Sequence, residues 1–274
     1  MICAWKELLA ILPPVLRREA EAIDREKLQE LRLRINAPPE MILFGKSQWL
    51  SGKTSRDDLN FIINTASRYS PWSAATSAQG YLTAPGGHRI GICGEVVSRG
   101  GSVAGIREVN SLCIRIARDF HGIGKNAAGM KGSILILGAP GWGKTTLLRD
   151  LIRQLSEKEW VSVVDERGEL FPEGFERGKR TDVLTGCPKQ EGMEMLLRTM
   201  GPSCIAVDEI TAEADSMALL QAANCGVRLI ATAHASSIQD FCGRRVYRPL
   251  IEHKVFENLL VLREDKSYDV ERLI

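Results

Sequence analysis

The apolar positions follow two different patterns along the chain, and the change between them comes near residue 131. Before it, helical spacing in residues 2–12 and after Ser55 gives way to short alternating runs. Apolar residues three or four apart predict a helix, whereas alternation predicts a half-buried strand. After residue 131, continuous apolar runs typical of buried parallel strands alternate with helical stretches, the signature of an α/β domain. The pattern therefore predicts an N-terminal α+β domain at residues 1–122, a linker at 123–131 and an α/β domain at 132–274.

In the N-terminal part, the pattern predicts helices followed by a meander of short strands. A first helix spans residues 2–12 and ends at Pro13-Pro14, and a charged segment to Glu30 is expected to be helical. Ser55 is the expected N-cap of a further helix, with acidic residues in its first turn. The expected strands are Leu31–Ile35, Met41–Phe44, Tyr81–Thr83, His88–Val97, Val103–Val109 and Leu112–Ala117, with turns at Pro85-Gly86-Gly87 and Gly100-Gly101.

In the C-terminal part, strands and helices are expected to alternate. The expected strands are Ser133–Leu137, Val161–Val164, Cys204–Val207 and Arg228–Thr232, followed by Phe256–Leu262 and Tyr268–Leu273 as an antiparallel pair at the sheet edge. The expected helices are the leucine-rich stretch from Leu147 to Leu155, then Lys189–Met200, Thr211–Cys225 and Ile238–Pro249. This order predicts a mostly parallel sheet flanked by helices.

The stretch Gly138–Thr145, GAPGWGKT, matches the phosphate-binding pattern G-x-x-x-x-G-K-[ST] at every fixed position. A predicted strand precedes it and a predicted helix follows it. The glycines let backbone N–H groups surround phosphates, and the helix N-terminus adds its positive dipole end. Lys144 is expected to reach the β- and γ-phosphates, and Thr145 to bind Mg²⁺. The nucleotide-binding residues expected here are Gly138, Ala139, Pro140, Gly141, Trp142, Gly143, Lys144, Thr145 and Thr146.

An apolar strand that ends in two acids is the expected partner of this loop. Cys204–Val207 leads into Asp208 and Glu209, about 64 residues after the loop lysine. In this Walker B pattern the Asp holds Mg²⁺ and the Glu polarises water. Together with Thr145, Asp208 is the expected metal ligand.

Val161–Val164 is a second apolar strand that leads into acidic residues. Because parallel strands deliver their C-terminal ends to one edge of a sheet, the acids of both strands are expected to converge near the γ-phosphate. One of them would act as general base on the attacking water, and Mg²⁺ is needed to offset their mutual repulsion. The acids expected to converge are Asp165, Glu166, Glu169, Asp208 and Glu209.

A third strand leads into Ala233-His234-Ala235 at the same predicted edge. From there His234 is expected to sense the γ-phosphate or to contact a water on Mg²⁺. A histidine that is satisfied within the structure and has no role in catalysis is the alternative.

Composition indicates a globular protein, with 44% hydrophobic and 26% charged residues and a net charge of +2. Residues 1–130 hold 17 basic and 12 acidic side chains, against 19 and 22 in the remainder. The N-terminal excess suits an anionic ligand, or it is simply a differently charged surface. The arginines of the predicted strands either contact phosphate or lie on solvated faces; they are Arg89, Arg107, Arg115 and Arg118.

The seven cysteines include no C-x-x-C pair, so a reducing cytoplasm is the expected compartment. Cys93, Cys113 and Cys204 lie in apolar strand-like runs and are expected to pack as small hydrophobes. No apolar run approaches ~18–20 residues, so no membrane span is predicted. Residues 1–12 lack the pattern of a signal peptide.

With these residues in place, the chain resembles the secretion-ATPase superfamily of type II, type IV and pilus motors, and more closely the stage III sporulation protein AA family. The superfamily's Asp, Walker B and His boxes would be Val164–Leu170, Ile205–Glu209 and Ala231–Ala235. Runs similar to the sporulation family extend along most of the chain. They are Leu31–Arg34 (LRLR), Gly86–Gly94 (GGHRIGICG), Ile114–Ala117 (IRIA), Gly186–Lys189 (GCPK) and Val207–Ile210 (VDEI).

The resemblance implies a RecA-like P-loop ATPase domain behind a smaller N-terminal domain, assembled as a ring that is usually a hexamer. Glu169 would match the superfamily's catalytic Glu, and Glu209 its Walker B Glu. Arg107 and Arg115 are the N-domain arginines that the resemblance makes candidates to reach the nucleotide. Asp208 stands where the secretion motors usually have Gly, so the division of labour between the two glutamates stays open.

We therefore predict an Mg²⁺-dependent ATP hydrolase. By resemblance alone, it would power a secretion-like channel between mother cell and forespore, from the mother-cell cytoplasm and peripherally at the membrane through membrane-embedded partners. Two other classes stay open: a RecA-like ATPase acting on single-stranded nucleic acid through the basic N-terminal domain and Arg244–Arg248, and a nucleotide-gated scaffold with little turnover. The near-neutral charge and the lack of a basic-aromatic series disfavour the first, and the full set of acids disfavours the second.

Overall fold

The computed structural model describes residues 2–43, 45–68, 80–99, 102–172 and 174–272. The chain divides into two compact units. One is Met1–Asp119 with Pro172–Phe175, and the other is Phe120–Phe171 with Glu176–Ile274. Each unit has its own sheet and its own buried core.

The N-terminal unit is built on a six-stranded sheet in which every neighbouring pair is antiparallel. Its strands are β2 (Leu28–Arg34), β3 (Glu40–Leu43), β4 (Lys46–Trp49), β5 (Tyr81–Thr83), β6 (Arg89–Arg99) and β7 (Ser102–Arg115), in the order β4-β3-β2-β7-β6-β5. The short β1 (Ile2–Cys3) and β8 (Arg118–Asp119) pair separately.

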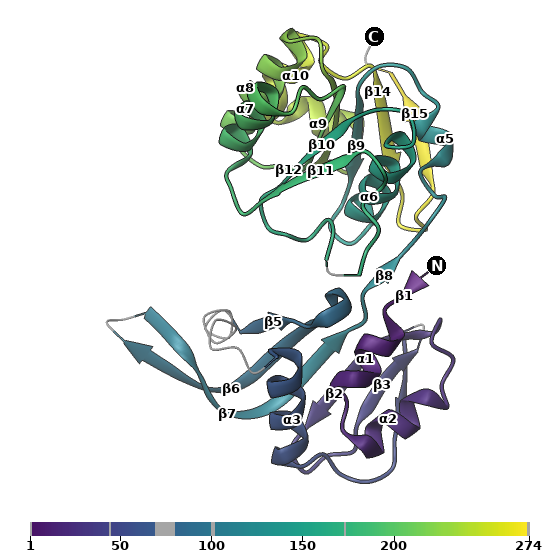
Figure 1. Ribbon diagram of the computed structural model, residues 1–274, viewed down its shortest axis with the longest axis vertical. Helices are drawn as coiled ribbons and strands as arrows, with labels where there is room; N and C mark the ends of the chain where they lie inside the picture. Colours follow the sequence, from purple (N-terminus) through teal and green to yellow (C-terminus); the bar gives the residue numbers. More distant parts are fainter. Residues whose placement is uncertain (1, 44, 69–79, 100–101, 173, 273–274) are drawn as a thin grey trace. The chain divides into compact units, whose positions relative to one another are not determined.

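Alternation along these strands creates one apolar face. Leu31 and Leu33 of β2 and Ile114 of β7 are fully buried on it. Three helices contribute apolar residues to the same core and cover that face (Figure 1). They are α1 (Trp5–Ile11), α2 (Pro14–Glu21) and α3 (Arg56–Ala66). The expected α+β character of this part is confirmed.

Ser55 begins α3 as the sequence predicts. Its hydroxyl accepts a hydrogen bond from the Asp58 amide at 3.1 Å, and the Asp58 carboxylate accepts one from the Ser55 amide at 2.8 Å. This reciprocal arrangement is a capping box, which satisfies two backbone donors at the helix N-terminus.

Several N-terminal predictions are wrong in detail. The charged segment expected to be helical up to Glu30 leaves the helix after Glu21, because the residues from Leu28 onward form β2, which pairs with β3 and β7. The two strands expected on either side of Asn110 are one strand, β7, which stays paired with β6 through a register shift. Gly94 lies at that shift, where an added Cβ would stand 2.7 Å from the Arg107 carbonyl oxygen. The turn expected at Gly100-Gly101 lies outside the described residues.

The C-terminal unit is built on a seven-stranded sheet of order β11-β10-β12-β13-β9-β14-β15. The strands are β9 (Ile134–Gly138), β10 (Val161–Asp165), β11 (Thr181–Thr185), β12 (Cys204–Ile210), β13 (Arg228–His234), β14 (Asn258–Leu262) and β15 (Tyr268–Glu271). All neighbours are parallel except the closing pair β14–β15. The mostly parallel sheet and its antiparallel edge confirm the expected α/β class.

Alternate strand residues enter two cores on opposite faces of this sheet. In β9, Ile134 and Ile136 face α6 (Lys144–Leu155) and the short α5 (Lys125–Ala128). Leu135 and Leu137 belong to the other core. That second face is covered by α7 (Lys189–Thr199), α8 (Glu213–Asn224), α9 (Ile238–Gly243) and α10 (Arg248–Glu252), as Figure 1 shows. The P-loop strand is therefore buried on both faces, as a central parallel strand requires.

Three differences from the predicted elements stand out in this unit. The stretch expected to be a plain linker contains α5. The edge strand β11 was missed because its half-exposed sequence, TDVLT, lacks the apolar run of a buried strand. The helix expected over Ile238–Pro249 is divided: extended backbone at Arg244 ends α9, and Pro249 lies in the first turn of α10, where its missing N–H is not needed.

Of the three cysteines expected to pack in the core, Cys204 is buried, whereas Cys93 is exposed and Cys113 half-buried.

Candidate nucleotide-binding site

The P-loop connects the C-terminal end of β9 to the first turn of α6. Gly141 and Gly143 have φ values of 76° and 99°, in the left-handed region that favours glycine. An added Cβ at Gly141 would have no atom within 4 Å, so glycine is favoured at this position by the backbone conformation and not by lack of space. The expected strand–loop–helix context is present.

Lys144 is folded back onto its own loop and is 7% exposed. Its Nζ donates to the carbonyl oxygens of Gly138 and Ala139 at 2.9 and 3.1 Å and lies 3.1 Å from Nδ1 of His234. Burial lowers the pKa of Lys144, against the opposing effect of Glu209 and Asp208. Three partners therefore occupy the three donors of the ammonium group at the position where phosphate oxygens would bind.

His234 connects the loop lysine to the end of β12. The β13–β9 register places it opposite Gly138, the first residue of the P-loop. Because Nδ1 must accept from the Lys144 ammonium, Nε2 carries the proton and donates to Oε1 of Glu209 at 2.8 Å. The second oxygen of Glu209 accepts from Arg167 at 3.2 Å. Lys144, His234, Glu209 and Arg167 thus form one continuous chain of hydrogen bonds.

Glu209 is held in an unusual backbone conformation. Its φ is 51°, and the β12–β13 register shifts between Val207 and Ile210, so the two acids lie in a bulge. The hydroxyl of Thr232 on β13 accepts from the Glu209 amide at 2.8 Å and donates to Oδ1 of Asp208 at 2.7 Å. One buried threonine thereby fixes both acids of the Walker B pair.

The residues expected to hold Mg²⁺ lie together. Thr145 Oγ1 donates to Oδ2 of Asp208 at 3.0 Å. A hydroxyl and a carboxylate are the hard oxygen ligands that Mg²⁺ prefers, and it usually takes few protein ligands together with substrate phosphates and water. In keeping with this, the described residues contain no cluster of three or more His, Cys, Asp or Glu that could hold a metal by itself. The pair therefore fits an ion that arrives with a nucleotide.

The loop after β10 presents Glu169 to the same place. The buried carboxylate of Asp165 accepts from the amides of Glu169 and Leu170 at 3.0 and 2.9 Å. On the other side, the Arg149 guanidinium of α6 donates to the Glu169 carbonyl oxygen at 3.1 Å and to that of Leu170. Side chains from two elements thus hold this loop in place.

The five acids do converge. One small cavity at this sheet edge is lined by Thr145, Asp165, Glu166, Arg167, Glu169, Lys189, Asp208 and Glu209. It receives both carboxyl-terminal strand ends, as parallel neighbours β10 and β12 predict. The cavity holds the candidate metal ligands and both candidate general bases.

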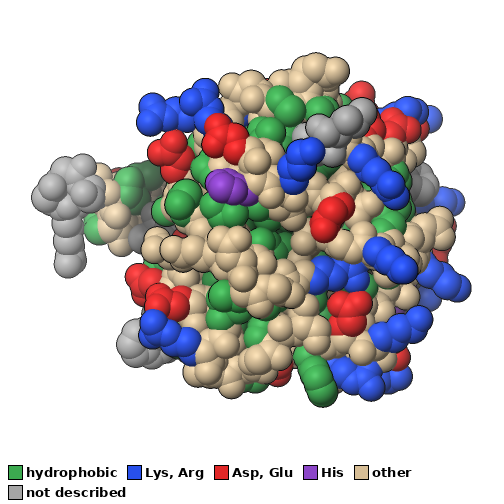
Figure 2. All heavy atoms as spheres, turned by 90° about the horizontal axis from the view of Figure 1, so that it is seen from above, with side chains coloured by type: hydrophobic (Ala, Val, Ile, Leu, Met, Phe, Trp, Pro, Cys, Tyr) green, Lys and Arg blue, Asp and Glu red, His purple; other side chains and the backbone are tan. Residues whose placement is uncertain are grey.

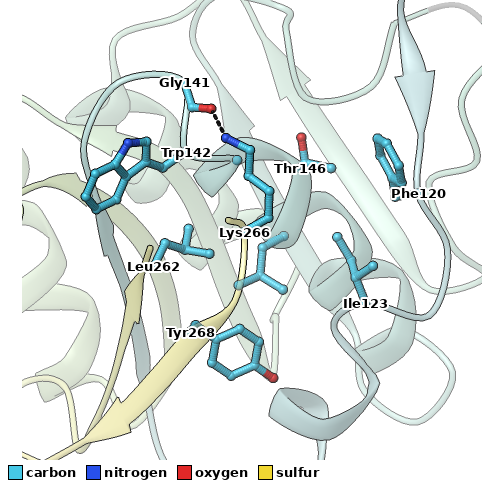
Figure 3. A pocket seen from close by; sticks show the side chains of 10 residues that line it. Phe120, Ile123, Gly141, Trp142, Thr146, Leu262, Lys266 and Tyr268 are labelled. Atoms are coloured by element: carbon cyan, nitrogen blue, oxygen red, sulfur yellow. Dashed lines mark hydrogen bonds between the residues drawn. The ribbon is translucent and has the colours of Figure 1, made fainter. Parts of the chain in front are cut away.

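A second, larger pocket of about 430 Å³ lies on the other side of the P-loop (Figure 3). Its walls are mainly apolar and come from the β14–β15 hairpin, the start of α6 and the segment before α5. They consist of Phe120, Ile123, Gly141, Trp142, Gly143, Thr146, Leu147, Leu262, Lys266 and Tyr268. Lys266 reaches from the hairpin turn to the loop, and its Nζ donates to the Gly141 carbonyl oxygen at 2.6 Å. The size and apolar walls of this pocket suit a flat heterocyclic ring.

The two arginines suggested by resemblance lie on β7 in the N-terminal unit. Arg107 forms an ion pair with Glu95 at 2.6 Å and is well exposed. Arg115 lies 3.5 Å from Glu30. Their proposed contact with nucleotide stays a prediction.

Sequence reasoning missed four residues that support the site. Thr232 had a signal, since it is the one hydroxyl in the otherwise apolar run Leu229–Ala233. Arg149, Arg167 and Lys189 had none, because a charged residue on a predicted helix or loop does not reveal which carboxylate it will meet.

Comparison with known proteins identifies the family. A model of the family described as sporulation stage III, protein AA, matches residues 5–271. The chain belongs to this family. Stage III sporulation protein AA of Bacillus subtilis (strain 168) is 37% identical, covering 95% of this chain and 92% of that protein. Protein SEEDLING PLASTID DEVELOPMENT 1 of Arabidopsis thaliana is 28% identical over 85% of this chain, which is 34% of that longer protein.

Solved structures of ATPases have a similar fold. The Legionella pneumophila ATPase DotB superposes with a TM-score of 0.62 at 18% identity, covering 95% of this chain and 80% of that one. The pilus retraction motor PilT, solved with bound ADP, gives 0.63 at 14% identity, covering 95% and 78%. These likenesses confirm the RecA-like ATPase fold with its smaller N-terminal domain that the resemblance implied.

Proposed function

We propose that this chain is an Mg²⁺-dependent ATPase that hydrolyses ATP to ADP and phosphate. The observation that carries the proposal is the hydrogen-bonded chain from Lys144 through His234 to Glu209, beside the Thr145–Asp208 pair. A phosphate-binding lysine, a candidate metal site and a carboxylate for water activation are linked in one network. Such an arrangement supports hydrolysis more than nucleotide binding alone.

In this proposal the triphosphate lies along the P-loop, and Lys144 exchanges its carbonyl partners for phosphate oxygens. The base occupies the apolar pocket lined by Trp142 and Tyr268. Thr145 and Asp208 would hold Mg²⁺, which would supply charge neutralisation at the phosphates. Water attacks the γ-phosphorus and gives its proton to Glu169 or Glu209 while the bond to the β–γ bridging oxygen breaks, leaving ADP and phosphate.

For the biological setting, we propose that hydrolysis powers assembly of, or transport through, a secretion-like channel between mother cell and forespore. The Bacillus relative is named as a sporulation protein, and the proteins of similar fold are an ATPase and a pilus motor. The proposed partners are further copies of this chain, assembled as a hexameric ring, and membrane-embedded components of the complex. We propose a location in the mother-cell cytoplasm, peripherally at the membrane.

Among the described residues, no helix combines the length and apolar composition that crossing a bilayer requires.

The basic run considered for nucleic-acid contact is largely engaged within the protein. Arg244 forms two hydrogen bonds with Asp240, at 2.9 and 3.0 Å, and Arg245 pairs with Glu213 at 3.2 Å. On the face seen in Figure 2, basic and acidic side chains are interspersed. Both observations favour the ATPase motor over a nucleic-acid-dependent enzyme, which predicts a continuous basic surface.

The decisive experiment replaces the loop lysine. Lys144→Ala is expected to lower ATP turnover by about 10² to 10³, because it removes the cation that meets the developing phosphate charge. It should also weaken binding of a fluorescent ATP analogue. Lys179→Ala, which removes an exposed lysine paired with Glu157, is the matched control and should retain both properties. Wild-type turnover in Lys144→Ala would refute the site.

A further inference from the structure

Lys189 is a buried cation in the acid-lined cavity. It is 7% exposed and is the first residue of α7. Its Nζ donates to Oε2 of Glu166 at 2.5 Å and lies 3.8 Å from Oδ2 of Asp215. Burying an ammonium group costs considerable free energy unless carboxylates compensate it, so this position is closely defined by its two partners.

The two partners belong to the segments that carry the candidate catalytic acids. Glu166 lies in the loop between β10 and Glu169. Asp215 caps α8, where its carboxylate accepts from the amides of Thr211 and Ala212 at 2.9 and 3.1 Å, directly after the Walker B strand. Lys189 therefore connects the start of α7 to both acid-bearing segments.

The start of α7 is fixed by close packing. An added Cβ at Gly192 would lie 2.7 Å from Cγ1 of Val164 and 2.8 Å from Sγ of Cys187. The helix backbone therefore approaches β10 at the point where the strand delivers its acids. This contact holds Lys189 over the cavity rather than toward solvent.

The cavity is lined by more acidic than basic side chains, and Lys189 offsets part of this negative charge. Five carboxylates and two cations, Arg167 and Lys189, line it. The carboxylate of Asp165 accepts from two backbone amides, and that of Glu209 contacts Arg167 and His234. Glu166, by contrast, has its ion pair with Lys189. Glu166 and Asp208 line the same cavity, so a Glu166 carboxylate released from that pair is a hard oxygen ligand available to a divalent cation there.

We propose that Lys189 is a positioning residue of the ATPase centre, which neutralises Glu166 and keeps it from binding the divalent ion. The ion then binds at Thr145 and Asp208 together with the phosphates rather than among free carboxylates. This inference rests on the proposed ATPase function for its effect on turnover. Its effect on divalent-ion binding does not depend on turnover.

The test measures Mn²⁺ binding by electron paramagnetic resonance in the full-length, nucleotide-free protein. Lys189→Met leaves Glu166 unpaired, so Mn²⁺ affinity is expected to rise about tenfold. Glu166→Gln removes one carboxylate and leaves the Lys189 ammonium with Asp215 alone, so the affinity should fall. The double variant removes both charges and should return close to wild type. Glu191→Gln, an exposed acid on α7 outside the cavity, is the control and should change nothing.

Turnover and stability provide the second readout. Lys189→Met is expected to lower kcat about tenfold or more and to change the Mg²⁺ dependence of turnover, and Lys189→Arg should restore much of both. A purely structural lysine would lower the melting temperature and leave Mn²⁺ affinity and Mg²⁺ dependence unchanged, which would overturn the proposal. A double variant with the Mn²⁺ affinity of Lys189→Met would also overturn it. If Lys189→Met does not fold, the fall in Mn²⁺ affinity expected for Glu166→Gln still tests the proposal, and an unchanged or higher affinity in that variant would overturn it.

These measurements separate the two proposals. A wild-type protein that binds ATP without hydrolysing it refutes the ATPase function, while the opposite Mn²⁺ shifts still test Lys189. A wild-type protein that hydrolyses ATP alongside unshifted Mn²⁺ affinities refutes the role of Lys189 alone.

Discussion

At the scale of single residues, the acids of the site depend on side chains from neighbouring strands and helices. Thr232 holds the bulge that presents Glu209, and Arg149 holds the loop that presents Glu169. The positive φ of Glu209 is a backbone strain, and the hydrogen bond from its amide to Thr232 stabilises it. Both glutamates are therefore held at the cavity in fixed positions. Their geometry does not distinguish which one is the general base, so a kinetic experiment is needed.

Substitution of each glutamate distinguishes their roles. The glutamate that accepts the proton from water should lose about 10²-fold or more in kcat when changed to Gln, because the amide cannot act as a base. Binding of a fluorescent ATP analogue should be retained in both Glu169→Gln and Glu209→Gln. Single-turnover rates measured beside the binding constants identify the base. Normal hydrolysis in both variants would mean that neither residue is the general base.

A residue of the N-terminal unit predicts a dependence of stability on pH. His88 is fully buried; its Nε2 donates to the Ala4 carbonyl oxygen at 2.8 Å, and its Nδ1 accepts from the Ala117 amide at 3.1 Å. Burial lowers the pKa of His88 below its usual 6.5. Below about pH 6.5 the unfolded chain therefore binds a proton at His88 that the folded protein does not bind. As the pH is lowered through this range, the free energy of unfolding decreases by up to about 1.4 kcal/mol per pH unit.

Urea unfolding between pH 7.5 and 5.5 measures this effect. His88→Gln removes the titrating ring, so its free energy of unfolding should fall less over this range than that of wild type. The other three histidines are common to both proteins and cancel in the comparison. Equal pH slopes in the two proteins would show that His88 contributes nothing.

At the scale of elements, the order of the strands builds the site. Placing β13 between β12 and β9 brings Thr232 and His234 between the Walker B acids and the P-loop. The same parallel arrangement gathers the acidic strand ends at one edge. The helices contribute by closing both faces, and α7 adds Lys189 to the cavity.

One helix offers a direct test of local sequence information. Ser55→Ala removes the hydroxyl of the α3 capping box and is expected to lower the free energy of unfolding by about 1 kcal/mol. Asn60→Ala, on the exposed side of the same helix, is the control and should be neutral or slightly stabilising, since alanine favours helix. Denaturant titration of both variants checks the difference. Equal stability of Ser55→Ala and wild type would mean that the cap contributes little.

At the scale of the whole molecule, the chain has two units, each with its own core, and the proposed motor is a ring of such chains. If sites complete one another across an interface, hydrolysis per subunit should rise steeply with protein concentration, in step with oligomer mass. Turnover assays beside mass measurements, with and without a slowly hydrolysed ATP analogue, test this. A rate per subunit that is independent of concentration while the mass changes would show that each chain works alone.

Several parts of this protein depend on local chemistry and can be predicted from the amino-acid sequence alone. The P-loop needs left-handed backbone at Gly141 and Gly143, and Ser55 and Asp58 specify a helix start, so both could be recognised in the linear pattern. Continuous apolar runs likewise predicted the buried strands of the C-terminal unit. Convergence of Asp165 and Glu169 with the Walker B pair followed from one rule about parallel strands.

Which side chains contact one another around the site depends on the three-dimensional fold. Strand β11 exists because β10 offers it hydrogen bonds, although its own sequence lacks the usual apolar pattern. Likewise, the links from Lys144 to His234, from Glu209 to Thr232 and from Lys189 to Glu166 join residues far apart in the chain. Such pairings depend on strand order and register, which hydrophobic periodicity does not encode. The sequence therefore predicted the nucleotide-binding loop, and the fold arranged the residues around it.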